Sequence, residues 1–276
     1  MWIRQLHALF LDTLRDAWSR KLILATVLSS ALSSGLLLWY MRTLSSRAPH
    51  AALTILAEQD PRYLDNAFAL RDILAATASM GFWTQVGFTI MLMAGAMAML
   101  LAPERNAMIA ASAVPRGLIL PGRFLGCLFL TLVGITLTFG TVFAACGLQY
   151  EVWHWRFLGS IGTAWLAAGA TLALLALIQV MANSVAVGTV LLVATAVVSV
   201  GAQYPERVRE VTGSPAVASL FTMIGSLLPR SGEIAHWTSV FVYSGVTAQA
   251  MPLYATAAGA AVMLVAASVV YTRKEF

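Results

Sequence analysis

Charged residues are scarce in this sequence. Asp, Glu, Lys and Arg make up 11% of its 276 residues, whereas 59% are hydrophobic and the mean hydropathy is +0.80. Soluble domains carry about 25% charged residues, so this composition excludes an ordinary water-soluble domain and favours a lipid bilayer as the solvent. The net charge is +5, but the basic residues are spread thinly, without a Lys/Arg cluster. We therefore expect no nucleic-acid partner and attribute the charge to membrane topology.

The motifs of several enzyme classes are also missing. Lys21 and Lys274 are the only lysines, and neither lies in a G-x-x-x-x-G-K-[ST] phosphate-binding loop. The sequence has no H-E-x-x-H zinc motif and no G-x-S-x-G nucleophile elbow, and its four histidines show no ligand spacing. We predict that the chain is not an enzyme and has no catalytic residue, metal or cofactor. Any ATPase that drives it must then be a separate polypeptide.

Cysteine is nearly absent as well. Cys127 and Cys146 fall in one apolar run. On one continuous helix they lie about 28 Å apart, at a rise of about 1.5 Å per residue. A disulfide needs Cα atoms within about 7 Å, so the two thiols cannot pair within one chain.

Long apolar runs dominate the rest of the chain. Six of them are long enough to cross about 30 Å of hydrocarbon, which takes around 20 helical residues. None contains Asp, Glu, Lys, Arg or His, which disfavours gradient-driven carriers and voltage sensors because these need ionisable groups in the membrane. The predicted fold is an all-α membrane protein, a single transmembrane domain over 1–276 with a six-helix bundle over 22–271. The predicted spans are Leu22–Met41, Gly81–Leu101, Phe124–Cys146, Phe157–Met181, Val185–Val200 and Pro252–Tyr271.

The amino-terminal segment, 1–19, has the pattern of an amphipathic helix. At 100° per residue its polar side chains fall within an arc of about 120°, with apolar side chains opposite. Such a helix lies in the membrane interface. It is either a generic anchor or an elbow helix that also meets a cytoplasmic partner through Arg4 and Arg15. Charges continue from Asp12 to Lys21 before a run too long for a typical signal peptide, so we expect a retained first span.

The Lys and Arg distribution predicts that both termini are cytoplasmic, because the shorter inside segments carry their charges close to span ends. Arg42–Met80 is then a polar external loop, in which 65–72 could form a surface helix. The second external segment, Gln203–Met251, contains two apolar stretches, Ala216–Leu228 and Ile234–Val246. Each is too short to span, so they predict a re-entrant helical hairpin before the last span. The alternative is two helices lying flat on the outer surface.

One segment resembles a known family. After the second predicted span come Ala102-Pro103-Glu104-Arg105 and a short potentially helical stretch. Ser112-Ala113-Val114-Pro115-Arg116-Gly117-Leu118-Ile119-Leu120-Pro121-Gly122-Arg123-Phe124-Leu125-Gly126 follow. This resembles the cytoplasmic loop of type-two ABC exporter permeases, where an acidic residue ends span two. There a turn like Pro-Val-Ser-Arg precedes a Gly-Lys-Phe-Leu start of span three. The closing Tyr271-Thr272-Arg273-Lys274-Glu275-Phe276 is similar to the basic and aromatic tail of many members.

The resemblance implies a permease subunit of the inner (plasma) membrane that exports or extracts a substrate. It would pair with a second copy of itself and sit on two ABC ATPase subunits. The loop from Glu104 to Arg116 would be a coupling helix, a lever that tilts two spans when the ATPase pushes it. The implied coupling residues are Glu104, Arg105, Asn106, Pro115 and Arg116. The alternative is a solvated turn whose arginines only set topology.

Two other functions stay open. The first is a non-transporting transmitter that drives an extracytoplasmic partner bound to Arg42–Met80 or Gln203–Met251. One variant serves metal-site maturation, as in permeases associated with nitrous oxide reductase. Its support is a group of thioethers, which bind Cu(I), at Met91, Met93, Met97 and Met99. The second is an ion-coupled carrier, which the uncharged spans disfavour.

Overall fold

The computed structural model describes most of the chain as helix. The described residues are 2–47, 66–98, 115–151, 153–182, 184, 186–187, 190–191, 193–194, 205–217, 219–220, 223, 229–245 and 250–273. No strand occurs among them, which confirms the predicted all-α class. The helices are α1 (Trp2–Ser19), α2 (Leu22–Arg47), α4 (Asn66–Ala98), α6 (Arg116–Tyr150), the 3-10 helix η3 (Trp155–Leu158), α7 (Gly159–Ala182), α9 (Pro205–Thr212), α11 (Ser231–Ser244) and α12 (Met251–Arg273).

Five of the described helices are long and apolar enough to cross a membrane, which is consistent with a multi-pass membrane protein. Their candidate spans are Leu22–Thr43, Arg71–Ala94, Arg116–Gln149, Trp155–Ala182 and Met251–Arg273. The first, third, fourth and sixth predicted spans each lie inside one of these segments. The predicted span Val185–Val200 falls mostly outside the described residues. Its described positions, 186–187, 190–191 and 193–194, are helical and exposed.

The predicted start of the second span at Gly81 is wrong. One continuous helix, α4, begins at Asn66. Its first half lies where the external loop was expected to continue to Met80, and the surface helix expected at 65–72 is part of it from Asn66 onwards. Leu74 and Ala78 in this half are at most 1% exposed. Small side chains here let neighbouring helices approach closely, so protein rather than lipid buries a segment too weakly apolar to be recognised as a span.

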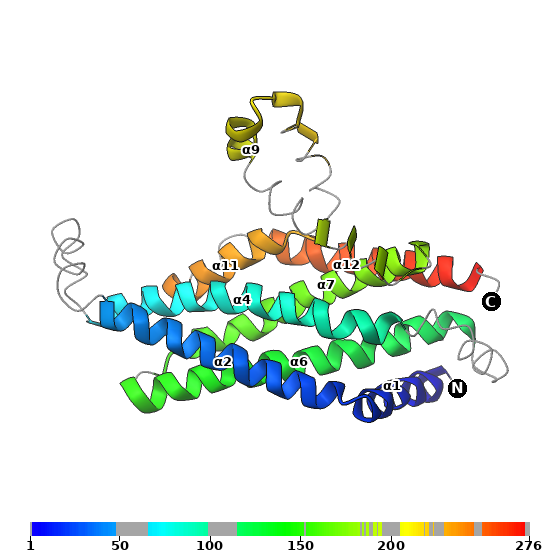
Figure 1. Cartoon of the computed structure of the whole chain (residues 1–276), viewed down its shortest axis with the longest axis horizontal. Helices are drawn as coiled ribbons and strands as arrows, with labels where there is room; N and C mark the ends of the chain where they lie inside the picture. Colours follow the sequence, from blue (N-terminus) through cyan, green and yellow to red (C-terminus); the bar gives the residue numbers. More distant parts are fainter. Residues whose placement is uncertain are drawn as a thin grey trace.

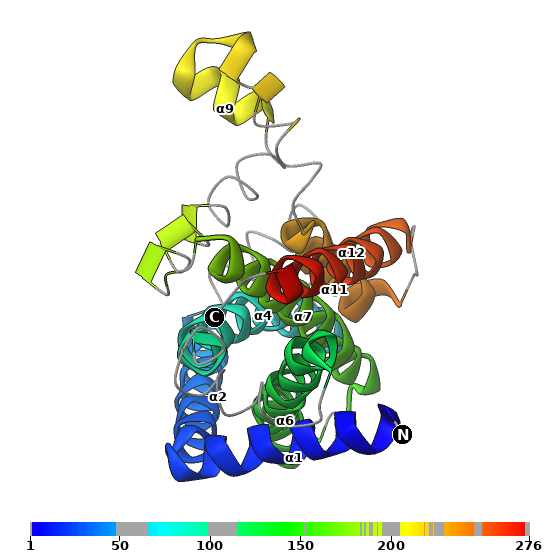
Figure 2. The same ribbon diagram turned by 90° about the vertical axis from the view of Figure 1, so that its right-hand side faces the viewer.

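The long helices run lengthwise beside one another, and both chain ends lie at one end of the bundle (Figure 1). We call this the α1 end and the opposite one the far end. Figure 2 shows α1 side-on while α2 and α6 are foreshortened, so α1 lies across the bundle axis. The turn from α1 into α2 uses Lys21 in the left-handed conformation, with φ of 58°. Its amide donates to Trp18 O at 3.0 Å, which closes the last turn of α1.

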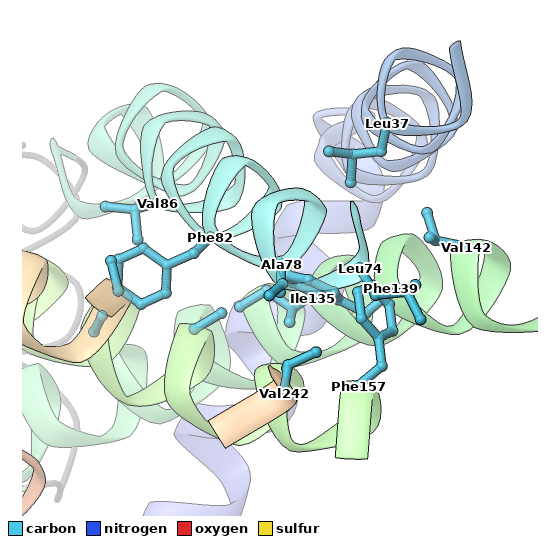
Figure 3. Packing of buried hydrophobic residues seen from close by; sticks show 14 of the residues in the cluster. Leu37, Leu74, Ala78, Phe82, Val86, Ile135, Phe139, Val142, Phe157 and Val242 are labelled. Atoms are coloured by element: carbon cyan, nitrogen blue, oxygen red, sulfur yellow. The ribbon is translucent and has the colours of Figure 1, made fainter. Parts of the chain in front are cut away.

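Apolar packing at the far end joins α2, α4, α6, α7 and α11 (Figure 3). Leu37, Phe82 and Phe139 are fully buried there. The ring of Phe139 lies 5.5 Å from that of Phe157, which carries the contact to η3. At the α1 end a second cluster joins α1, α4, α6, α7 and α12. Helix α7 takes part in both clusters and contacts α4, α6, α11 and α12, so it lies at the centre of the bundle.

A buried polar joint links α2, α4 and α6 between the two clusters. Gln85 Nε2 donates to Thr138 Oγ1 at 2.7 Å, and Thr138 Oγ1 donates to Gly134 O at 3.0 Å. From α2, Ser30 Oγ also donates to Gly134 O at 3.0 Å. Hydrogen bonds between helices are the main directional attraction in an apolar solvent. The joint therefore specifies the register of these three helices.

Thr138→Val should lower the stability of the bundle, because it leaves the buried Gln85 amide without its acceptor. We expect a loss of about 1–2 kcal/mol in the free energy of unfolding and a fall in Tm of about 2–6 °C. The measurement is thermal unfolding in detergent. Thr141→Val is the matched control three residues along α6, because its exposed hydroxyl bonds only to Leu137 O of the same helix. Equal Tm values for the two variants would show that the hydrogen bonds of the polar joint do not stabilise the bundle.

Candidate functional site

The predicted coupling residues lie at the α1 end where the structure describes them. Pro115 directly precedes α6 and Arg116 is its first residue, and both are exposed. Leu118 N donates to Pro115 O at 2.9 Å, so the helix is closed from its first turn. Glu104, Arg105 and Asn106 lie outside the described residues. Of the predicted coupling loop, the structure therefore places only the final two positions.

The third span was predicted to begin at Phe124, whereas α6 begins two turns earlier. Pro121 lies inside this extension and has no amide to donate to Gly117 O. Pro121 is the sixth residue of α6, beyond the four amides that lack partners at a helix start, so it removes one hydrogen bond from the second turn. The extension carries Arg116 and Arg123 out of a loop and into the first two turns of α6. A force applied at Arg116 would therefore act directly on α6.

The α1 helix is confirmed, and its surface divides into three stripes rather than the two expected. Leu9, Thr13 and Ala17 are buried against the bundle. Ile3 and Trp18 are 84% and 74% exposed, on the side expected to meet lipid. The third stripe is polar and includes the exposed Arg4 and Arg15. One helix thus has a face packed on the bundle, an exposed apolar face and an exposed polar face, while its function as an elbow stays a prediction.

Two glycines of α6 receive the buried stripe of α1. A methyl group built on Gly122 would lie 2.6 Å from Leu9 Cβ, and one built on Gly126 would lie 2.6 Å from Thr13 Cβ. Both distances are below van der Waals contact, so only glycine fits at these positions. Glycines four residues apart share one helix face and allow close helix packing. We call this contact the α1–α6 joint.

Arg123 lies between the two glycines in sequence and is 3% exposed. Among the described residues it is the one charged side chain that is buried. Its Nη2 lies 3.7 Å from Asp12 Oδ2 of α1, whose side chain is half exposed. The sequence analysis treated Arg123 only as a topology charge. The available signal was its place within Gly122-Arg123-Phe124-Leu125-Gly126, a cation inside a close-packing pattern.

The carboxyl end of α12 reaches the same region. A methyl group built on Gly117 would meet Thr272 Cγ2 at 3.7 Å, so the last turn of α12 lies beside the first turn of α6. Tyr271 is 2% exposed there. The exposed charged residues at the α1 end include Arg4, Arg15, Arg20, Lys21, Arg116 and Arg273, together with the acidic Asp12. We call the four arginines Arg4, Arg15, Arg116 and Arg273 the basic surface. Such a surface fits an acidic partner.

Of the methionine group, the structure describes the side chains of Met91 and Met93, and α4 places them on different sides. Met93 is 1% exposed within the core, whereas Met91 is 76% exposed. The side chains of Met97 and Met99 lie outside the described part of the chain. Within the described residues no group of His, Cys, Asp or Glu is arranged to hold a metal ion.

At the far end, α11 corresponds to the second apolar stretch predicted at 234–246. Ile234, Thr238 and Val242 are buried, so one face of the helix packs on α4 and α7. His154 Nε2 lies 2.8 Å from Val242 O in its last turn. His154, which lies between two tryptophans, therefore has a structural role, because a hydrogen bond from its ring to this carbonyl caps the carboxyl end of α11. Whether α11 belongs to a re-entrant hairpin stays a prediction.

Cys127 and Cys146 both lie in α6, and both are buried free thiols. Cys127 packs in the cluster at the α1 end and Cys146 in the cluster at the far end. Their separation along one helix agrees with the sequence-based argument against pairing.

Comparisons with protein-family models, with curated proteins and with solved structures find no match for this chain. The family resemblance therefore rests on the residues of the loop and tail themselves.

Proposed function

We propose that this chain is the membrane-spanning permease subunit of an ATP-driven ABC transporter, which exports or extracts a substrate and is powered by a separate ATPase. The observation that carries the proposal is the α1–α6 joint beside Arg116. Through it, the amphipathic helix, the start of the third span and the basic surface form one rigid unit at the end of the bundle where the resemblance puts the ATPase.

The joint makes mechanical coupling physically reasonable. α1 continues directly into α2 through the turn at Lys21, and it is packed on α6 at Gly122 and Gly126. A displacement of either α1 or Arg116 therefore moves two spans together. Close packing transmits such a displacement because protein interiors have few voids to absorb it.

The source of energy is inferred from the polar groups inside the bundle. In the described spans, charged residues occur only near the ends, as with Arg42 and Arg71, and the polar joint is made of hydroxyl, amide and carbonyl groups. Proton-driven transporters use ionisable residues near mid-membrane. The proposed subunit takes its energy from the partner on its cytoplasmic face, with both termini on that side and a second copy of the chain completing the pathway.

Charge reversal at Arg116 should weaken binding of the ATPase. We expect affinity purification of the tagged full chain from its native membranes to recover a polypeptide with a G-x-x-x-x-G-K-[ST] motif and ATPase activity. The substitution Arg116→Glu should lower the recovery of this ATPase about tenfold, equivalent to about 1.4 kcal/mol of binding free energy. The reason is that the substitution places an acid on a surface that fits an acidic partner.

Arg71→Glu is the matched control, an exposed arginine at the start of α4 on the far end. Its recovery of the ATPase should equal that of the unmodified chain. The proposal fails if no such ATPase accompanies the unmodified chain. It also fails if the purified chain alone accumulates solute in liposomes under an ion gradient.

A further inference from the structure

Two arginines project from the side of α1 that faces away from the bundle. Leu9, Thr13 and Ala17 form the buried stripe of this helix. At 100° per residue, Arg4 and Arg15 lie about 160–180° from the middle of that stripe, and both are exposed. They lie within about 20° of each other around the helix and about 17 Å apart along it. We call these two residues the outward arginines.

An exposed apolar arc lies on one flank of the outward arginines. Ile3, Leu11 and Trp18 are 84%, 48% and 74% exposed. They span about 80° of the helix, and the arc ends about 20° from Arg4. Within α1, His7 is the one polar side chain inside this arc. On the other flank the exposed side chains are small or polar: Ala8, Asp12 and Ser19. The outward arginines therefore mark the line where the surface of α1 changes from apolar to polar.

The two acidic side chains of α1 are engaged with other arginines. Asp16 lies 3.4 Å from Arg20, and Asp12 lies 3.7 Å from the buried Arg123. Among the residues that the structure describes, the outward arginines form no ion pair. The outward side of α1 is therefore positively charged, and it fits an anion.

The surface of a bilayer matches both the arginines and the apolar arc. Helix α1 lies across the bundle axis, which places it along the surface of a membrane that the bundle crosses (Figure 2). The apolar arc then enters the edge of the hydrocarbon, at the level where tryptophan is enriched. The arginine stems lie on apolar surface while their guanidiniums reach phosphates, which they match through two parallel N–H donors. An acidic protein bound to the arginines alone would leave Ile3 and Trp18 in water.

We propose that the outward arginines bind the phosphates of anionic phospholipids, so that the charge of the bilayer holds α1 on the membrane surface. Because α1 is packed on α6 through the α1–α6 joint, lipid that holds α1 also stabilises the joint. Of the basic surface, Arg116 and Arg273 are left for an ATPase. The inference does not rest on the proposed function, because α1 would bind lipid in the same way in a chain with no ATPase.

The test is hydrogen exchange of the purified full chain in nanodiscs, read on the amides of α1 by mass spectrometry. Discs of phosphatidylcholine are compared with discs that contain about 30% phosphatidylglycerol, which gives them an anionic surface. Each basic residue near such a surface strengthens binding about fivefold, so the α1 amides should exchange about 25-fold more slowly in the anionic discs. The double variant Arg4→Gln/Arg15→Gln should bring this ratio of exchange rates close to one.

The matched control is Arg116→Gln/Arg273→Gln, which removes the same charge at the same end of the bundle but not from α1. Its ratio should stay about 25-fold. Arg4→Lys/Arg15→Lys should keep most of the ratio, because lysine retains the charge. A ratio near one for the unmodified chain would overturn the proposal, as would an equal loss in the two glutamine variants.

A protein partner gives a different result. If Arg4→Gln/Arg15→Gln keeps the ratio of exchange rates but recovers less of the ATPase from native membranes, the outward arginines bind a protein, and the assignment to lipid is wrong.

Discussion

Gly126→Leu is expected to release α1 from α6 and to lower the Tm of the chain by about 6–12 °C. A methyl group at this position already comes within 2.6 Å of Thr13 Cβ, so a leucine cannot fit unless α1 moves away. Separation also exposes Leu9, whose burial stabilises by about 1.5–3 kcal/mol. Overpacking costs about 1–3 kcal/mol if α1 instead stays in place, so by either route the expected loss is about 3 kcal/mol.

The measurement combines thermal unfolding with limited trypsin digestion. Release of α1 should speed cleavage after Arg20 and Lys21, because the turn between α1 and α2 loses its support. Gly140→Leu is the matched control on the same helix, since a methyl group there has no atom within 4 Å. If both variants resist trypsin equally and unfold at the same temperature, the α1–α6 joint does not hold α1.

Arg123→Glu is the second large effect, with an expected loss of about 3–5 kcal/mol in the free energy of unfolding. The substitution buries an acid and places it beside Asp12, which now lies 3.7 Å from the Arg123 guanidinium. Repulsion replaces attraction at a side chain that the bundle buries, although Asp12 itself is half exposed. Arg123→Glu combined with Asp12→Arg should recover part of the loss, because the attraction is then restored with its signs exchanged.

The control is Arg20→Glu, which removes the 3.4 Å ion pair between the half-exposed Arg20 and Asp16 in the last turn of α1. Exposed pairs of this kind contribute about 0.2–1 kcal/mol, so its Tm should change little. Chemical denaturation of all four proteins in the same detergent gives the comparison. Recovery of no stability in the double variant would show that Arg123 does not act on α1 through Asp12.

Several elements were predictable because the membrane imposes a simple condition on the sequence. A helix that meets lipid needs about 20 consecutive apolar residues, and α2, α7 and α12 satisfy it with clear polar ends. The amphipathic α1 was also predictable, because its polar side chains repeat at the helical period. The order and approximate extent of these elements follow from the pattern of apolar and polar residues along the sequence.

The two errors have different physical origins, and the first comes from burial by protein instead of lipid. The first half of α4 carries Arg71, Asp72 and several small polar residues, and hydropathy alone assigned it to a loop. It is nevertheless helical and buried, because α2, α6 and α11 surround it. The early start of α6 was missed because Pro121 and Arg123 are typical of a loop when judged locally.

The sequence by itself determined that the chain is helical, apolar and long enough in its apolar runs to cross a membrane. The reason is that each helix that meets lipid must itself contain about 20 consecutive apolar residues, whatever its neighbours are. The sequence also determined which side chains carry charge and how few of them lie in the spans. Only the tertiary structure decided that Gly122 and Gly126 receive α1 and that Arg123 is buried against Asp12. These pairings join residues about a hundred positions apart, and helix packing alone specifies such distances.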